Sequence, residues 1–190
     1  MKEALSKSHI RIFLAVLGTA TLVLGASYTM VQQSTRLSAN DIPLSLSQTI
    51  SNELDSGSSP NDVIASQMVN LASNTNPFII ITDDSKHVLA STAHLNGQTP
   101  LPPAGVFSYT DAHGSDHFTW QPADNVRLAT RVVTYGTKGK DAGFIITGQS
   151  LKPYEDRIQV YGELALIAWF AVLAWNFLVL LLSERKFQTK

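Results

Sequence analysis

Four side chains that could bind a metal lie close together near the middle of the chain: Asp111, His113, Asp116 and His117. Zinc and nickel accept both imidazole nitrogens and carboxylate oxygens as ligands. Gly114 is expected to end a helix, which places His113 in the last turn and leaves Asp116 and His117 to begin a strand. Because successive strand residues face opposite sides, Asp116 and His117 do not readily share one metal. His113 and His117 therefore stay as metal candidates by spacing alone, and we expect no bound metal or cofactor.

A second candidate site contains two arginines, Arg127 and Arg131. They lie four residues apart in a segment of strand-like pattern, so their side chains share one face. Two guanidinium groups that face the same way can hold a carboxylate through bidentate hydrogen bonds. Tyr109 and Trp120 are candidates for the aromatic wall of such a site. These four residues predict a binding site for a small carboxylate ligand.

The alternative is that the sheet itself supplies partners for both arginines. A hairpin turn centred on Ala123 and Asp124 would place Trp120 opposite Arg127, in cation–π contact. The same register would place Asp116 opposite Arg131. Both guanidinium groups would then be paired without a ligand, so the two interpretations stay open.

Other chemistry is not indicated by the sequence. The chain has no Walker loop, HExxH helix, EF-hand loop or GxSxG turn. It also has no cysteine, which excludes disulfides, thiol nucleophiles and thiolate zinc sites. The formal net charge of -1 gives no electrostatic basis for binding nucleic acid. We therefore expect neither an enzyme nor a nucleic-acid-binding protein.

The composition points to a membrane instead. The 190 residues are 44% hydrophobic and 15% charged, whereas charged residues make up about 25% of an ordinary soluble domain. The apolar residues concentrate in residues 12–31, which carry no charge, and residues 164–182, where Asn176 is the strongly polar member. At about 1.5 Å per residue, each run can cross the roughly 30 Å hydrocarbon core of a bilayer. We expect two transmembrane helices.

Flanking charges predict the topology of these two helices. The cytoplasmic ends are expected to be residues 1–11 and 183–190, because six basic residues lie there: Lys2, Lys7, Arg11, Arg185, Lys186 and Lys190. The intervening segment, residues 32–161, contains 8 Lys or Arg and 12 Asp or Glu, a net charge of -4. We expect it to be extracytoplasmic and the protein to lie in the plasma membrane. The alternative is a signal peptide cleaved after Ser27, although the apolar run is longer than a usual signal sequence.

Asn176 is a candidate for helix association. An amide in hydrocarbon usually finds a hydrogen-bond partner on a neighbouring helix. Small residues that allow close helix packing recur in both runs: Gly18, Gly25, Ala165, Ala168, Ala171 and Ala174. We expect association with a partner membrane protein or with a second copy of the chain.

The extracytoplasmic segment has the order of elements of an α+β domain. Helical periodicity covers residues 34–55, with a kink or restart at Pro43, and a short second helix is expected to reach Leu71. A hairpin over residues 78–90 and a short helix ended by Gly114 follow. Three strands and a helix leading into the second apolar run complete the order, over residues 116–121, 126–135, 143–149 and 153–161.

The hairpin begins Pro77-Phe-Ile-Ile-Ile-Thr-Asp-Asp84 and is followed by a helical crossing and three antiparallel strands. This arrangement resembles the extracytoplasmic PAS-like or Cache-like sensor domains of bacterial histidine kinases and chemoreceptors. Four shorter segments are similar to periplasmic sensor segments: Gly105-Val-Phe, Thr119-Trp-Gln-Pro122, Val126-Arg-Leu-Ala129 and Gly148-Gln-Ser-Leu151.

The resemblance implies two transmembrane helices that flank a domain with a five-stranded antiparallel sheet and long N- and C-terminal helices. Eight residues follow Leu182, so we expect no HAMP linker, phosphoacceptor helix or ATPase domain. The expected function is a bacterial sensor or accessory subunit that binds a small ligand or partner and signals through another protein. The alternative is a structural envelope protein that uses the same domain only for docking.

Overall fold

The computed structural model describes residues 2–64, 67–137 and 140–188, with side chains over residues 8–64, 67–136 and 142–182. It contains two compact units. The helical unit comprises Met1–Thr35 and Asp156–Lys190, and the central domain comprises Arg36–Glu155. The basic side chains of the two predicted cytoplasmic ends lie outside the described side chains, apart from Arg11.

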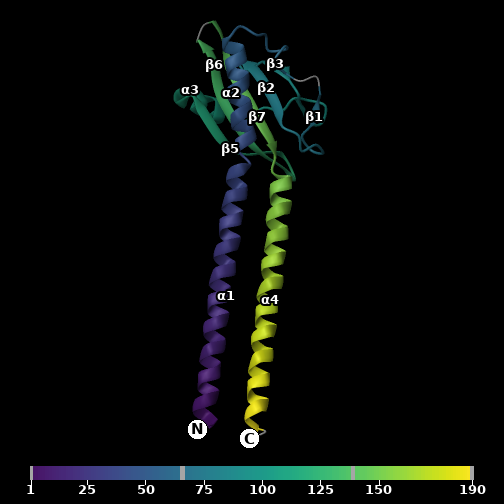
Figure 1. The fold of residues 1–190 in the computed structure, drawn as a ribbon. Helices are drawn as coiled ribbons and strands as arrows, with labels where there is room; N and C mark the ends of the chain where they lie inside the picture. The colour runs from purple at the N-terminus through teal and green to yellow at the C-terminus, as the bar shows by residue number, and fades with distance from the viewer. Residues whose placement is uncertain (1, 65–66, 138–139, 189–190) are drawn as a thin grey trace. The chain divides into compact units, whose positions relative to one another are not determined.

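The central domain is built on a five-stranded antiparallel sheet, as the sequence predicts. Its strands lie in the order β3-β2-β7-β6-β5 (Figure 1). Alternating or continuous apolar patterns of β-branched and aromatic residues account for these strands. Their bounds are β2 Phe78–Asp83, β3 Val88–Ser91, β5 Ser115–Ala123, β6 Val126–Thr137 and β7 Lys140–Ser150. The strand β7 lies at the centre of the sheet, between β2 and β6.

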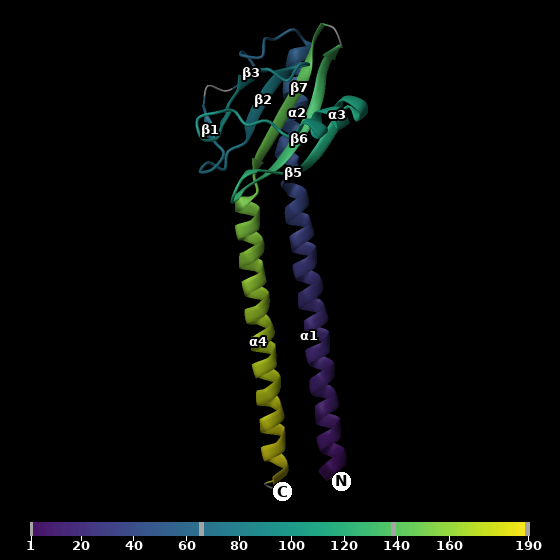
Figure 2. The same cartoon turned by 180° about the vertical axis from the view of Figure 1, so that it is seen from behind.

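Each face of the sheet has its own apolar core. On one face α2, Asp41–Asp55, covers a cluster that includes Ile50, Ile81 and Ile145; α2 lies in front of the sheet in Figure 1 and behind it in Figure 2. On the other face α3, Ala104–His113, contributes Phe107 to a larger cluster with Phe144 and Trp120. Alternation along each strand directs neighbouring residues to these two cores.

The predicted helix over residues 34–55 is interrupted. The first helix, α1, spans Lys2–Ser38, and α2 begins at Asp41 after a turn at Ala39 and Asn40. Pro43 lies in the first turn of α2, where a helix needs no backbone N–H donor. The predicted restart at Pro43 is therefore confirmed to within two residues.

The short helix predicted to reach Leu71 is wrong in the described residues. The chain forms turns at residues 61–64, and Val69–Asn70 is a strand, β1, paired in parallel with β4, Ala93–His94. Val69 is buried in the larger core. A pairing with residues 24 positions further along the chain leaves no local periodic signal, and the apolar spacing of this segment resembles that of a helix.

The predicted register of the β5–β6 hairpin is also wrong. Its loop is Asp124 and Asn125, one position later than predicted, and Trp120 lies opposite Leu128 rather than Arg127. Asn125 has a φ of 61°, a conformation that asparagine tolerates in tight hairpins. This register places Trp120 and Leu128 together in the larger core, which the predicted one would have separated.

Two helices are long and apolar enough to cross a membrane. The most apolar 18-residue stretches within Ser8–Asp55 and Lys152–Leu182 have mean hydropathies of 1.8 and 2.4. No residue of either stretch is buried. The second belongs to α4, Lys152–Gln188. Apolar helix surfaces that the protein itself leaves unburied are suited to lipid rather than water.

Candidate functional site

The end of β7 holds the helices that lead to both membrane segments. Gln149 is 4% exposed, and its Nε2 donates one hydrogen bond to the Ala39 carbonyl oxygen at 2.9 Å and another to the Tyr154 hydroxyl oxygen at 2.8 Å. Ala39 follows the last residue of α1, and Tyr154 lies in the first turn of α4. One buried amide therefore joins the C-terminal end of α1 to the start of α4.

Thr147 makes a parallel contact one pleat earlier on the same face of β7. Its Oγ1 donates to the Pro43 carbonyl oxygen at 2.8 Å, and the side chain is fully buried. We call the set Ala39, Pro43, Thr147, Gln149 and Tyr154 the β7 junction. Buried polar groups of this kind are costly to leave unpaired, so the junction fixes one arrangement of these segments.

A second, exposed contact fixes the first turn of α4. The Leu151 N–H donates to the Arg127 carbonyl oxygen at 2.8 Å, and the Arg127 guanidinium forms an ion pair with Glu155. Both charged side chains are about half exposed, at 51% and 42%. Such a pair contributes little energy, about 0.2–1 kcal/mol, but it restricts the direction of the helix start.

The opposite end of β7 borders an open cleft of about 620 Å³, which we call the β2–β3 cleft. Its walls come from the end of α2 and from strand ends, and include Leu54, Gly57, Asp83, Leu89, Tyr135 and Ala142. Ala142 and Gln149 are seven residues apart on β7, which corresponds to about 23 Å along a strand. The same strand therefore links the cleft with the β7 junction.

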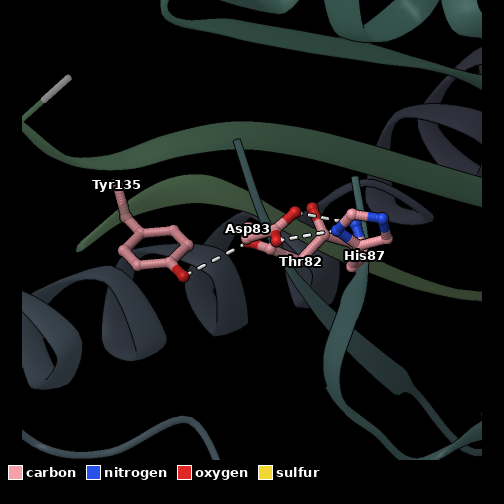
Figure 3. A network of polar contacts seen from close by, with 4 residues as sticks. All are labelled: Thr82, Asp83, His87 and Tyr135. Atoms are coloured by element: carbon pink, nitrogen blue, oxygen red, sulfur yellow. Dashed lines mark hydrogen bonds and ion pairs between the residues drawn. The ribbon is translucent and has the colours of Figure 1, made fainter. Parts of the chain in front are cut away.

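Polar contacts organise one wall of this cleft (Figure 3). The Tyr135 hydroxyl donates to the Thr82 carbonyl oxygen at 3.2 Å. The Asp83 carboxylate accepts the His87 backbone N–H at 2.7 Å and lies 3.0 Å from His87 Nδ1. Partial desolvation raises the pKa of Asp83, but these contacts with His87 outweigh it and lower the pKa below 3.8.

Close backbone contact couples β7 to this wall. A Cβ atom on Gly143 would overlap the Thr82 carbonyl oxygen, so only glycine fits at this position. Residues 143–148 pair in unbroken register with β2. Thr82 and Asp83 therefore lie directly against β7, with no loop between them.

The four residues predicted to bind a ligand are not brought together. Trp120 packs in the larger core with its ring centroid 6.4 Å from that of Phe78. Arg127 and Arg131 do share a face, but it is the α2 side of the sheet, opposite to that of Trp120. Tyr109 is half exposed on α3. The predicted carboxylate site has no common cavity in this arrangement.

The two arginines have different surroundings. Arg127 is paired with Glu155, and neither the cation–π contact with Trp120 nor the pair between Asp116 and Arg131 is formed. Arg131 lies opposite His117 and donates from Nη2 to Ser115 Oγ at 3.3 Å. Its Nε is buried without a partner among the described residues.

Of the two histidines considered as metal ligands, His113 contacts another side chain and His117 faces solvent. His113 stacks on Tyr109 with ring centroids 4.0 Å apart, and its Nδ1 lies 2.9 Å from the Tyr109 carbonyl oxygen. His117 is exposed on the edge strand β5. Over the described part of the chain, no three His, Asp or Glu side chains gather in a way that could hold a metal.

In the described part of the helical unit, the backbones of α1 and α4 are not closely packed, despite the glycines and alanines in both helices. The helices are linked instead through side chains, because Trp169 Nε1 donates to Thr21 Oγ1 at 2.8 Å. The Nδ2 atom of Asn176 is buried and has no partner among the described residues. Its predicted role in helix association remains a prediction.

Sequence inspection missed Gln149, although a signal was present. Thr147 and Gln149 interrupt the apolar alternation of an otherwise buried central strand. A glutamine at such a position requires polar partners, because burying an unpaired amide is unfavourable. The identity of those partners depends on a break in a helix more than 100 residues away, which no local pattern reveals.

Comparisons with protein-family models, with curated proteins and with solved structures give no match to this chain.

Proposed function

We propose that the chain is a membrane-anchored sensor or accessory regulatory subunit. Its central domain binds a small ligand or a partner outside the cytoplasm and passes that event to another membrane protein through α1 and α4. The observation that carries this proposal is the double hydrogen bond of Gln149, which connects the last residues before α2 with the first turn of α4. Because both hydrogen bonds come from one side chain, a shift of β7 would act on α1 and α4 together.

The fold supports a PAS-like or Cache-like identity for the central domain. The hairpin of β2 and β3, the helix α3 and the three further antiparallel strands follow one another in the order on which the resemblance rests. A helix precedes the sheet and another follows it directly, as the resemblance requires. Under this proposal both chain ends are cytoplasmic and the acidic segment between the helices is translocated, in keeping with the flanking basic residues.

The route of transmission that we propose is β7. Binding in the β2–β3 cleft would contact Asp83 and Tyr135, and close contact between Gly143 and Thr82 couples that wall to β7. At its other end β7 carries Gln149. Switching interfaces typically move by about 1–2 Å, a displacement that the two hydrogen bonds of Gln149 would pass to both helices.

A docking module without a small ligand is the second candidate. The observation in its favour is the dense core between the sheet and α3, where Phe107 and Phe144 pack edge to face with ring centroids 5.1 Å apart. Phe78, Phe107 and Phe144 are each no more than 3% exposed. A side of the sheet filled in this way leaves little room for a ligand there.

Thermal unfolding of the full chain in bilayers separates the two candidates. The panel contains small carboxylates, amines and divalent metals. A ligand that binds the native state at 100 times its Kd adds about 2.7 kcal/mol to stability and raises the midpoint. At least one compound that raises the midpoint, and also alters crosslinking between cysteines placed at Val31 and Tyr161, supports the sensor. If no compound shifts the unfolding midpoint, a small-ligand sensor is contradicted and the docking module becomes the better candidate.

A further inference from the structure

A groove of about 530 Å³ lies within the helical unit, between the segments of α1 and α4 that are apolar enough to cross a membrane. Its lining residues are Thr21, Leu24, Gly25, Tyr28, Gly162, Ala165, Leu166 and Trp169. From Thr21 to Tyr28 the groove extends for seven helical residues, or about 10 Å. We infer that it binds one acyl chain of a membrane phospholipid.

The spacing of the two helices creates the groove. Small residues at a helix interface normally allow two backbones to come together. Here Gly25 has no atom within 4 Å of a Cβ position, and Gly162 is approached by the Tyr28 ring, at 3.3 Å. Gly25 therefore borders open space, whereas Gly162 leaves room for the Tyr28 ring that lines the groove. The space beside Gly25 must be filled in a bilayer.

The chemistry of the walls selects an apolar occupant. The Trp169 N–H is already used by Thr21 Oγ1, and the Thr21 hydroxyl donates to the Leu17 carbonyl oxygen at 2.8 Å. This bridge also closes one end of the groove. An occupant therefore meets aliphatic and aromatic carbon along the walls and need not supply a hydrogen bond, which suits a hydrocarbon chain.

The dimensions favour an acyl chain over a helix from another protein. A specific protein interface takes about 20–30 residues from each partner, whereas eight residues line this groove. A helix about 10 Å in diameter would also have to pass the Trp169–Thr21 bridge to continue along the pair. An acyl chain is narrow enough to end at that bridge. The binding of an acyl chain in this groove does not depend on the sensor function proposed above.

Tryptophan quenching by brominated lipid tests this inference in the full chain. Bilayers are made from phosphatidylcholine with one brominated acyl chain. The Trp175→Phe variant reports on Trp169 in the groove, and Trp169→Phe reports on Trp175, which is 67% exposed on the same helix. Trp120, buried in the central domain, is common to both and should not be quenched.

Two glycine substitutions provide the matched comparison. Gly25→Leu fills the groove, and Gly18→Leu places the same side chain elsewhere on α1, since neither glycine has a neighbour within 4 Å. We expect Trp169 to be quenched by the brominated chain, to lose most of that quenching in Gly25→Leu, and to keep it in Gly18→Leu. Trp175 should be quenched equally in both variants.

Two outcomes would overturn the inference. Trp169 fluorescence that resists the brominated lipid while Trp175 is quenched would mean that protein, such as a second copy of the chain, covers the groove. Quenching of Trp169 that is the same in Gly25→Leu and Gly18→Leu would mean that lipid reaches the indole without entering the groove.

Discussion

The amide nitrogen of Gln149 lies 2.8 Å from the hydroxyl oxygen of Tyr154, five residues further along the chain. The first residue belongs to the end of the central strand β7 and the second to the first turn of α4. Because the other amide N–H is given to the Ala39 carbonyl, this side chain holds the C-terminal end of α1 as well. One side chain at the end of β7 therefore contacts both the residue that follows α1 and the first turn of α4.

Loss of the Gln149 amide should destabilise the central domain. The Gln149→Leu variant keeps the volume but leaves the buried Ala39 carbonyl oxygen without this donor, at an expected cost of about 1–3 kcal/mol. Denaturant unfolding of the full chain carrying Trp169→Phe and Trp175→Phe, followed through the fluorescence of Trp120, measures the change. The matched control is Gln48→Leu on the exposed side of α2, which should change stability by less than about 0.5 kcal/mol. Equal losses of stability in the two variants would show that the hydrogen bonds of Gln149 do not stabilise the domain.

The Arg127–Glu155 pair should be weak and sensitive to salt. A double-mutant cycle of Arg127→Met and Glu155→Gln should give a coupling of about 0.2–1 kcal/mol that declines at high ionic strength, since both side chains are half exposed. A cycle of Arg127→Met with Trp120→Leu is the control. It should give a coupling below about 0.3 kcal/mol because these residues lie on opposite faces of the sheet. Substantial coupling to Trp120 would contradict the observed register.

Acid should weaken the domain through Asp83. Its pKa is lower in the folded chain than the ordinary value of 3.8, so its contribution to stability is present above that value and is lost as the pH falls through the lower folded pKa. Asp83→Asn should reduce this acid-dependent loss of stability, measured as the slope of unfolding free energy against pH. His87→Gln, which keeps the backbone donor, should remove only part of the effect. A slope unchanged in Asp83→Asn would contradict the assignment.

Reporter fusions should place both chain ends in the cytoplasm. Alkaline phosphatase fused after Ser91 should be active, and the same enzyme fused after Lys190 should be inactive, because the flanking basic residues favour cytoplasmic ends. The reverse pattern would refute the topology. A mature N-terminus at Tyr28 would establish cleavage of the first apolar run as a signal peptide.

Features that depend on local sequence were predictable. Long apolar runs identified the two candidate membrane helices, and Gly114 ends α3 with a φ of 81°, as a glycine in that position predicts. The hairpin register failed because a shift of one loop residue, at Asn125, exchanges the two faces of β5 relative to β6. Long-range pairings such as Val69 with Ala93 left no local pattern.

The β7 junction could be predicted only in part. A buried glutamine implies polar partners, but the Ala39 carbonyl becomes available to Gln149 because α1 ends at Ser38. The expected pairing of Trp120 with Arg127 failed because it rested on an incorrect register. Tertiary packing directs the indole into the core and the guanidinium to Glu155.

If Gln149 couples the sheet to both candidate membrane helices, loss of its amide must change the distance between α1 and α4. Spin labels are attached to Val31→Cys and Tyr161→Cys in the full chain in bilayers, and the distance distribution is recorded with Gln149 intact, with Gln149→Leu and with Gln48→Leu. We predict that Gln149→Leu shifts or broadens the distribution, while Gln48→Leu leaves it unchanged. A distribution that is the same with and without the Gln149 amide would show that Gln149 does not couple the two helices.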